Sequence, residues 1–154
     1  MPSPDTPGVI APPPLIFAGA LAAASGAAYF IGMPRLPALP ARITGGLLLA
    51  VGPALAGTAV ALMRRSGTHF SPYEPTTAIV ETGPYRWTRN PIYLGMALAY
   101  AGASLLERSA LPLLVLPGVI AVIDRGVIAR EERYLEDKFG DRYLAYKLRV
   151  RRWL

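Results

Sequence analysis

The sequence predicts an all-α membrane protein, a bundle of about four transmembrane helices followed by a C-terminal helix at the cytoplasmic membrane surface. Hydrophobic residues make up 53% of the 154 residues and the mean hydropathy is +0.35, which is high for a protein surrounded by water. Charged residues make up only 17%, and they lie between and after long uncharged stretches. This distribution favours a chain that lies mainly in lipid.

The first transmembrane span is predicted at residues 15–33, which form an uncharged stretch long enough to cross about 30 Å of hydrocarbon. The prolines of residues 1–14 disfavour a regular helix, so we expect a flexible leader there and a single domain over residues 15–154. A secretory signal peptide is the alternative for this region. The absence of Lys and Arg before the span and its length argue against that alternative.

The second span is predicted at residues 43–63, where Gly52 and Ala56 have the four-residue spacing that lets helix backbones approach closely in lipid. The third and fourth spans are predicted at residues 91–106 and 110–128. Only a short charged turn separates them, which indicates a tight helical hairpin.

The basic residues indicate the orientation of the four spans. One side carries Arg35, Arg42 and Arg108, and the other carries more basic residues: Arg64, Arg65, Arg86, Arg89 and the C-terminal tail. The positive-inside rule therefore places both termini and the polar segments in the cytoplasm. The frequent Ala, Pro and Arg residues suit a prokaryotic cytoplasmic membrane. The net charge of +6 is better explained by anionic lipid than by nucleic acid, because the excess lies beside apolar segments.

Two residue types limit the possible chemistry. The chain has no cysteine, which excludes disulfides, thiolate metal sites and cysteine nucleophiles. Its one histidine, His69, has no second ligand at a suitable spacing, so no metal site is expected.

The loop between the second and third spans ends in a segment suited to binding an anion. Asn90 and Pro91 are typical of a helix start, and in one interpretation they only cap the third span. In the other, the free amides of that helix end and the neighbouring Arg89 bind a carboxylate. Aromatic residues such as Tyr85 and Tyr93 then flank a planar or cationic group, although they also suit the membrane interface.

A second polar segment, residues 130–140, directly follows the fourth span and contains Glu131 and Glu132. Such a charge run is usually a solvated helix stabilised by pairs of opposite charge. Its position on the same side as Arg89 favours a shared site instead.

Taken together, these segments resemble the isoprenylcysteine carboxyl methyltransferase family and the related phospholipid methyltransferases. The resemblance covers roughly residues 67–154. It rests on the run from Gly83 to Gly95 (GPYRWTRNPIYLG) and on a later series, Glu131-Glu132, Phe139-Gly140, Tyr143, Tyr146 and Arg151-Arg152-Trp153. It implies a helical membrane enzyme that uses S-adenosylmethionine at the cytosolic face and takes a membrane lipid or lipid-like substrate from between its helices.

The resemblance also implies site residues. The cofactor-binding set is Tyr85, Arg89, Asn90, Pro91, Tyr93, Gly95, Glu131 and Glu132. Arg89 and Glu132 are the candidate catalytic residues. Arg89 suits a carboxylate of the cofactor or an anionic group of the substrate, and Glu132 or Glu131 is the candidate base if the acceptor is an amine, although binding of the cofactor's ribose or ammonium group is the preferred role for both glutamates. The eukaryotic pattern has His at the position of Asn90, and Asn can replace its hydrogen bonds but not its titration.

The sequence thus predicts methyl transfer from S-adenosylmethionine to a carboxyl, thiol or amine group of a hydrophobic acceptor. The alternative is a non-enzymatic membrane subunit or a small transporter that binds a partner or solute with the same polar face. No charged residue lies in the middle of a predicted span, which argues against a conduction path.

Overall fold

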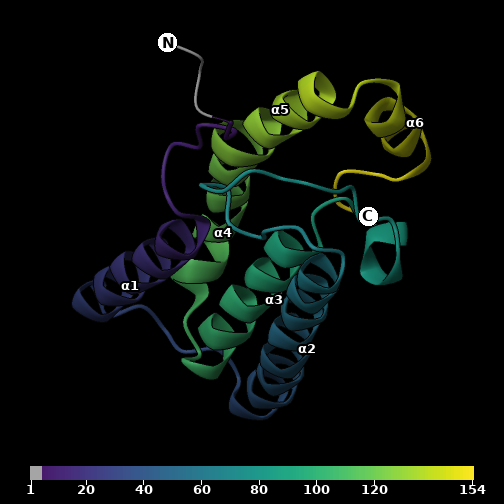
Figure 1. The fold of residues 1–154 in the computed structure, drawn as a ribbon. Helices are drawn as coiled ribbons and strands as arrows, with labels where there is room; N and C mark the ends of the chain where they lie inside the picture. The colour runs from purple at the N-terminus through teal and green to yellow at the C-terminus, as the bar shows by residue number, and fades with distance from the viewer. Residues whose placement is uncertain (1–4) are drawn as a thin grey trace.

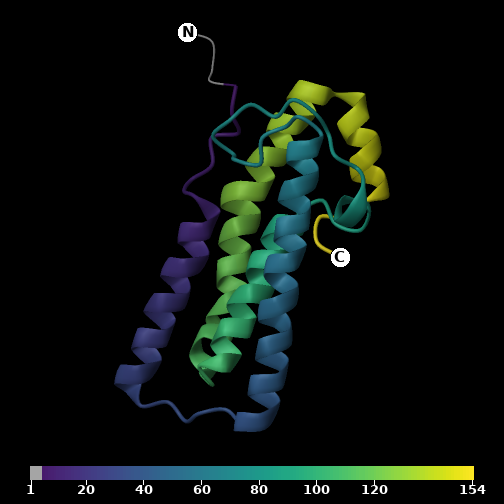
Figure 2. The same ribbon diagram turned by 60° about the horizontal axis from the view of Figure 1, so that its bottom comes forward.

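The computed structural model describes residues 5–154, so the predicted flexibility of residues 1–4 lies outside the described residues. The chain folds into a helical bundle, and the loop of residues 66–90 lies with the C-terminal helices at one end of it (Figures 1 and 2). Its elements are α1 (Pro13–Ile31), α2 (Ala38–Arg65), η1 (Gly83–Arg86), α3 (Pro91–Leu106), α4 (Ala110–Ile123), η2 (Asp124–Ile128), α5 (Ala129–Phe139) and α6 (Asp141–Arg149).

The lengths of these helices confirm the predicted membrane bundle. Three continuous helical stretches, Pro13–Ile31, Ala38–Arg65 and Ala110–Phe139, are long and apolar enough to cross a membrane, and α3 is a shorter apolar helix. The last stretch is uncharged as far as Ile123, η2 brings the charged pair Asp124-Arg125, and α5 continues with the polar sequence AREERYLEDKF.

The helix boundaries differ from the predicted spans mainly at their starts. α1 begins two residues before the predicted span, at Pro13, because proline is tolerated in the first helical turn, where the amide has no partner. α2 begins at Ala38 and its 28 residues extend about 42 Å, more than a bilayer core requires. α3 begins and ends at the predicted residues, and residues 107–109 form the predicted hairpin.

Glycines allow α2 and α3 to pack with their backbones in close contact, as the spacing of Gly52 and Ala56 predicts. A Cβ atom on Gly52 would lie 2.5 Å from the carbonyl oxygen of Gly95 and 2.7 Å from the amide nitrogen of Ala99. A Cβ atom on Gly95 would lie 2.5 Å from the carbonyl oxygen of Gly52. This packing fixes the position of α3, whose first turn forms part of the polar end.

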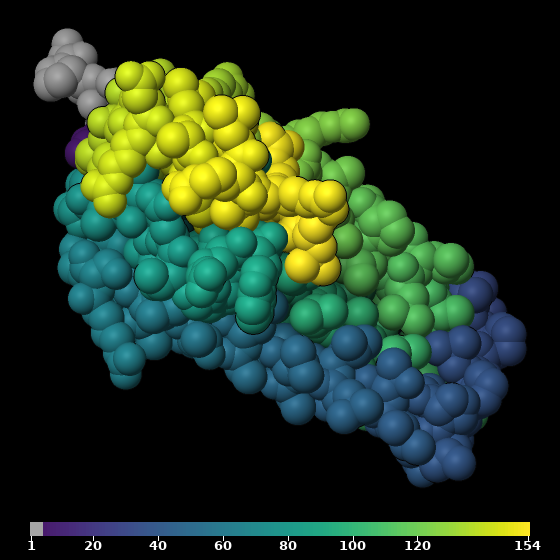
Figure 3. All heavy atoms as spheres, turned by 90° about the vertical axis from the view of Figure 1, so that its right-hand side faces the viewer, coloured from purple at the N-terminus to yellow at the C-terminus, as the bar shows by residue number. Residues whose placement is uncertain are grey.

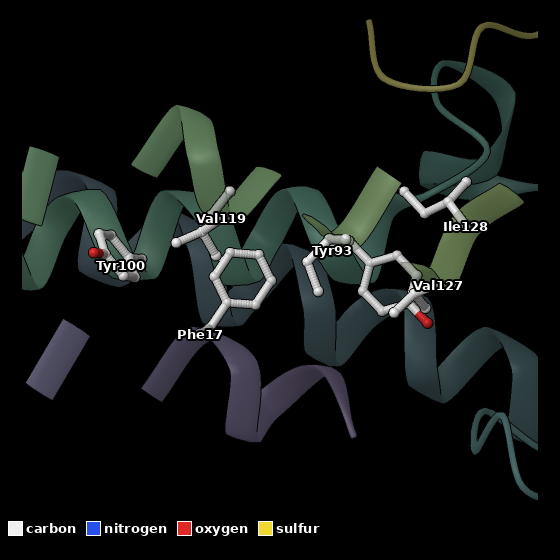
Figure 4. Packing of buried hydrophobic residues seen from close by; sticks show 8 residues of the cluster. Phe17, Tyr93, Tyr100, Val119, Val127 and Ile128 are labelled. Atoms are coloured by element: carbon white, nitrogen blue, oxygen red, sulfur yellow. The ribbon is translucent and has the colours of Figure 1, made fainter. Parts of the chain in front are cut away.

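The main core lies where α1, α3, α4 and the following turn meet. Phe17 of α1 packs edge-on against Tyr100 of α3, with ring centroids 6.3 Å apart (Figure 4). Between α4 and α5 the helix widens into a single π-type turn, η2, whose Val127 and Ile128 are fully buried. This buried turn anchors α5 to the bundle and sets the direction in which its carboxylates point.

We predict that Gly52→Ala lowers the melting temperature of the detergent-solubilised protein, because its methyl group would collide with backbone atoms of α3. Overpacking of this kind costs about 1–3 kcal/mol of unfolding free energy. Gly57→Ala is the matched control, since it adds the same methyl group to the same helix where no atom lies within 4 Å. Equal melting temperatures for the two variants would contradict this packing.

A candidate active-site cleft at the polar end of the bundle

A cleft of about 850 Å³, including its open mouth, lies at the polar end of the bundle. Its walls come from the loop before η1, from η1 itself, from the start of α3, and from α5 and α6. Seven of the eight residues predicted to bind a cofactor line it: Tyr85, Arg89, Asn90, Pro91, Tyr93, Glu131 and Glu132. The structure therefore brings together two segments that are about forty residues apart in the sequence.

Gly95 is the exception, because it does not line the cleft. It faces α2, where close backbone packing against Gly52 accounts for the absence of a side chain. Helix packing therefore explains Gly95 without a contact to a cofactor.

Glu132 is at the centre of a buried ion network. Its side chain is 5% exposed, and Arg89, which is 9% exposed, donates from Nη2 to Glu132 Oε1 at 2.7 Å. Arg152 donates to both carboxylate oxygens, at 3.0 Å from Nε and 2.5 Å from Nη2. Burial alone would raise the pKa of Glu132, but the hydrogen bonds and charges of Arg152 and Arg89 hold it below its ordinary value. Glu132 is therefore ionised and fully engaged with two guanidinium groups.

The rest of Arg89 binds the C-terminal segment of the chain. Its Nη1 donates to the carbonyl oxygens of Lys147 and Val150 at 2.9 and 2.8 Å. Its backbone amide donates to the carbonyl oxygen of Arg151 at 2.9 Å. In the described part of the chain, the guanidinium group that the sequence suggests as a carboxylate ligand thus has a partner for each nitrogen except Nε.

Asn90 and Thr88 also bind the C-terminal segment of the chain. The Asn90 side-chain amide and the Thr88 hydroxyl donate to the carbonyl oxygen of Arg152, at 2.9 and 3.0 Å. Asn90 is the N-cap residue of α3 and Pro91 follows at the first helical position, as predicted, but the Asn90 side chain makes no capping hydrogen bond. Its hydrogen-bonding capacity is used to hold the tail.

The C-terminal tail is therefore part of the cleft's supporting structure. The sequence favours a basic helix on the membrane surface there, and α6 does end in basic residues, but the helix stops at Arg149. Residues 150–153 then run beside residues 88–90, as Figure 3 shows for the yellow segment against the teal one. Trp153 donates from Nε1 to Asp124 at 3.1 Å, which fastens the end of the tail to η2.

Glu131 differs from its neighbour, because within residues 5–154 the Tyr93 hydroxyl, at 2.6 Å, is the one side chain that donates a hydrogen bond to it. Burial, and to a smaller extent the charge of Glu132, raise the pKa of Glu131 to about 7, although the Tyr93 hydroxyl opposes the shift. At neutral pH this carboxylate is close to the midpoint of its titration and faces the cleft.

Two polar atoms of cleft residues are buried and have no hydrogen-bond partner within residues 5–154. They are Tyr85 Oη and the Arg89 Nε described above. Both can donate a hydrogen bond, and a buried donor without a partner costs about 1–3 kcal/mol. Such atoms in a cleft indicate the polar contacts that a ligand can complete.

The leader forms part of the cleft wall, which its proline-rich sequence does not reveal. Pro7 lines the cleft, and Asp5 accepts hydrogen bonds from Tyr134 at 2.9 Å and Lys138 at 2.6 Å. Arg130 donates to the carbonyl oxygen of Gly8 at 2.8 Å. Residues 5–8 are thus held against α5 instead of extending freely.

No group of three or more His, Cys, Asp or Glu side chains that could hold a metal ion occurs within residues 5–154. His69 lies at the cleft, and its Nδ1 is 2.8 Å from an oxygen of Glu74. Both side chains are more than half exposed, so the contact is a surface pair.

Comparison with known proteins relates this cleft to a class of enzymes. A protein from Haemophilus influenzae described only as an uncharacterized protein is 44% identical over 68 residues, which are 44% of this chain and 82% of that one. Protein-S-isoprenylcysteine O-methyltransferase of Saccharomyces cerevisiae is 35% identical over 77 residues, 50% of this chain and 32% of the yeast protein. Methanethiol S-methyltransferase 1 of Bradyrhizobium diazoefficiens is 38% identical over 66 residues, 43% of this chain and 22% of that one.

The matched stretches thus span less than a third of the two methyltransferases that are named for their substrates. The sequence model of the phospholipid methyltransferase family covers a longer part of the chain, residues 40–142, which include nearly all of α2, the whole of α3 and both glutamates of the cleft. With two-thirds of its residues matched, this membrane protein belongs to the phospholipid methyltransferase family.

Proposed function

We propose that the protein transfers a methyl group from S-adenosylmethionine to a lipid-like or hydrophobic acceptor at the cytoplasmic face of a membrane. The observation that supports this most directly is the cleft itself. It lies at the end of a bundle of apolar helices and is lined by a titratable carboxylate, that of Glu131. Two buried hydrogen-bond donors at the cleft, Tyr85 Oη and Arg89 Nε, have no partner within residues 5–154. Family membership supports the reaction class.

The residues present fit S-adenosylmethionine in size and charge. A cleft of about 850 Å³ falls in the usual range for small-ligand sites. Glu131 suits the ammonium group of the cofactor, while Arg89 Nε and Tyr85 Oη can donate to its carboxylate or ribose oxygens. The aromatic rings of Tyr85 and Tyr93 suit the cationic and planar parts. The bound cofactor supplies a methyl group activated by the sulfonium charge.

The two glutamates have different roles in this proposal. Glu132 positions Arg89, and it is a poor base, because taking up a proton would weaken its bonds to Arg89 and Arg152. If the acceptor is an amine, Glu131 is the better candidate to receive its proton, since a pKa of about 7 matches neutral conditions. A thiolate or carboxylate acceptor requires only alignment and exclusion of water.

A hydrophobic acceptor is supported by the other wall of the cleft. Met63 of α2, Ile79 and Val80 of the loop, and Ile92 of α3 line it, and they belong to the side that joins the apolar helices. The cytoplasmic location is supported by the basic residues of this end, among them Arg64 and Arg65 at the end of α2.

We predict that calorimetric titration of the detergent-purified protein with S-adenosylmethionine detects binding and that Glu131→Gln weakens it about tenfold or more, because one charge-assisted hydrogen bond is lost. Asp137→Asn is the matched control. It removes one negative charge from the same helix at an exposed position outside the cleft. No binding to the unmodified protein at millimolar cofactor would contradict the proposed function, and equal affinities of the two variants would contradict the role of Glu131.

We also predict a pH dependence of cofactor binding. Below a pH of about 7 Glu131 is largely protonated and neutral, and above it the ionised form can pair with the cofactor's ammonium group. The dissociation constant should therefore fall as the pH rises from 5.5 to 8, with a proton released on binding near neutral pH. Glu131→Gln should remove both effects. A dissociation constant that stays constant or rises over this range in the unmodified protein would contradict the assignment.

A further inference from the structure

A second polar hollow lies at the opposite end of the bundle, where α1 ends and α3 turns into α4. It encloses about 730 Å³, including its open side, and Ser25, Arg35, Glu107, Arg108 and Ser109 line it. None of these residues belongs to the cleft described above. The hollow is therefore independent of the proposed activity.

The charged groups of this hollow are not paired with one another. Within residues 5–154, neither Arg35 nor Arg108 forms a salt bridge with any carboxylate, although Glu107 is adjacent in sequence to Arg108 and lines the same hollow. Glu107 is instead held by the Ser25 hydroxyl, which donates to Oε2 at 2.6 Å, and its other oxygen has no hydrogen bond within those residues. Two cationic groups and one anionic group are thus available to a ligand.

The backbone holds Arg108 firmly in place. Its φ of 58° lies in the left-handed region, which non-glycine residues adopt rarely. Two hydrogen bonds to Leu36 hold it there, one from Arg108 Nε to the Leu36 carbonyl oxygen at 2.7 Å and one from the Leu36 amide to the Arg108 carbonyl oxygen at 2.9 Å. Nε is fixed in this way, and both terminal nitrogens of the guanidinium group have no partner among residues 5–154. Strain of this kind is commonly found at functional positions.

A neutral group in the hollow also lacks a partner. The hydroxyl oxygen of Ser109 is buried and has no hydrogen bond within residues 5–154, although it lines the hollow. Ser109 is the N-cap residue of α4, yet its side chain does not cap that helix. A bound oxyanion can complete its hydrogen bonding.

The surroundings of the hollow favour a lipid as its ligand. Tyr29, Phe30 and Ile31 at the end of α1 are 81%, 87% and 70% exposed, beside a hollow that Tyr29 itself lines. Such side chains at the end of a transmembrane helix are typical of the membrane interface, where phospholipid headgroups lie.

From this arrangement we propose that the hollow binds the headgroup of a phospholipid that carries both a phosphate and a primary ammonium group, as phosphatidylethanolamine does. Arg35, Arg108 and the Ser109 hydroxyl bind the phosphate, and Glu107 accepts a hydrogen bond from the ammonium group. The bidentate geometry of guanidinium suits phosphate oxygens.

The test is native mass spectrometry of the detergent-purified protein with added phosphatidylethanolamine, phosphatidylcholine or phosphatidylglycerol. The unmodified protein should retain phosphatidylethanolamine at least fivefold better than phosphatidylcholine, whose quaternary ammonium has no N–H to donate. Arg35→Gln with Arg108→Gln should lower this retention at least fivefold. Arg42→Gln is the matched control, because Arg42 is exposed and does not line the hollow. Glu107→Gln should remove the preference for phosphatidylethanolamine over phosphatidylcholine.

Several outcomes would overturn the proposal. Equal retention of the three lipids would mean that no headgroup is recognised, and unchanged retention in the double arginine variant would place the lipid elsewhere. Loss of retention in Glu131→Gln, with the arginine variants unaffected, would assign the lipid to the cleft. Displacement by soluble phosphorylethanolamine at equal concentration would indicate a soluble ligand. Each variant is first checked for an unchanged melting temperature, and the single variant Arg108→Gln replaces the double one if that protein unfolds.

Discussion

The polar end of this protein depends on one buried carboxylate, that of Glu132. An ionised carboxylate can be removed from water only where cations and hydrogen-bond donors replace its hydration. Arg89 and Arg152 provide this replacement, and they come from the segment just before α3 and from the C-terminal tail. Because each guanidinium group is also bound elsewhere, to backbone carbonyls or to Asp124, the single carboxylate joins α3, α5 and the tail.

Helix packing in the apolar part of the bundle supports this ion network. Glycine contacts fix α3 against α2, and the buried turn η2 fixes α5 against α1, α3 and α4. Helix packing thus sets the distance between the two polar segments, and the ion network sets the orientation of their side chains. Glu131 is left beside Tyr93 and forms no salt bridge within residues 5–154, so its carboxylate is available to a ligand. A membrane methyltransferase needs such a site, rigid on the polar side and open to apolar groups on the other.

The sequence was sufficient for the bundle and for most of the cleft residues. The Asn90-Pro91 helix start and the polar turn at Glu107 gave the limits of α3, because both are local signals. The uses of Arg89 and Asn90 could not be predicted, since they bind backbone carbonyls of the tail, and any residue type has a carbonyl there. The contacts of the leader were missed for a similar reason, because prolines exclude a helix without indicating what the chain touches. The family resemblance assigns Gly95 to cofactor binding, and only the position of α2 shows that packing against Gly52 explains this glycine.

We propose that the tail and Glu132 hold the cleft in the form that binds S-adenosylmethionine. The most direct test is the dissociation constant of the cofactor for Arg152→Gln, which removes both bonds to Glu132 and the bridge to Asp124. Arg142→Gln, at an exposed position of α6, is the control for loss of a positive charge. We expect at least tenfold weaker cofactor binding for Arg152→Gln with its helical content retained. Cofactor binding by Arg142→Gln should be unchanged. Unaltered affinity in Arg152→Gln would contradict this proposal.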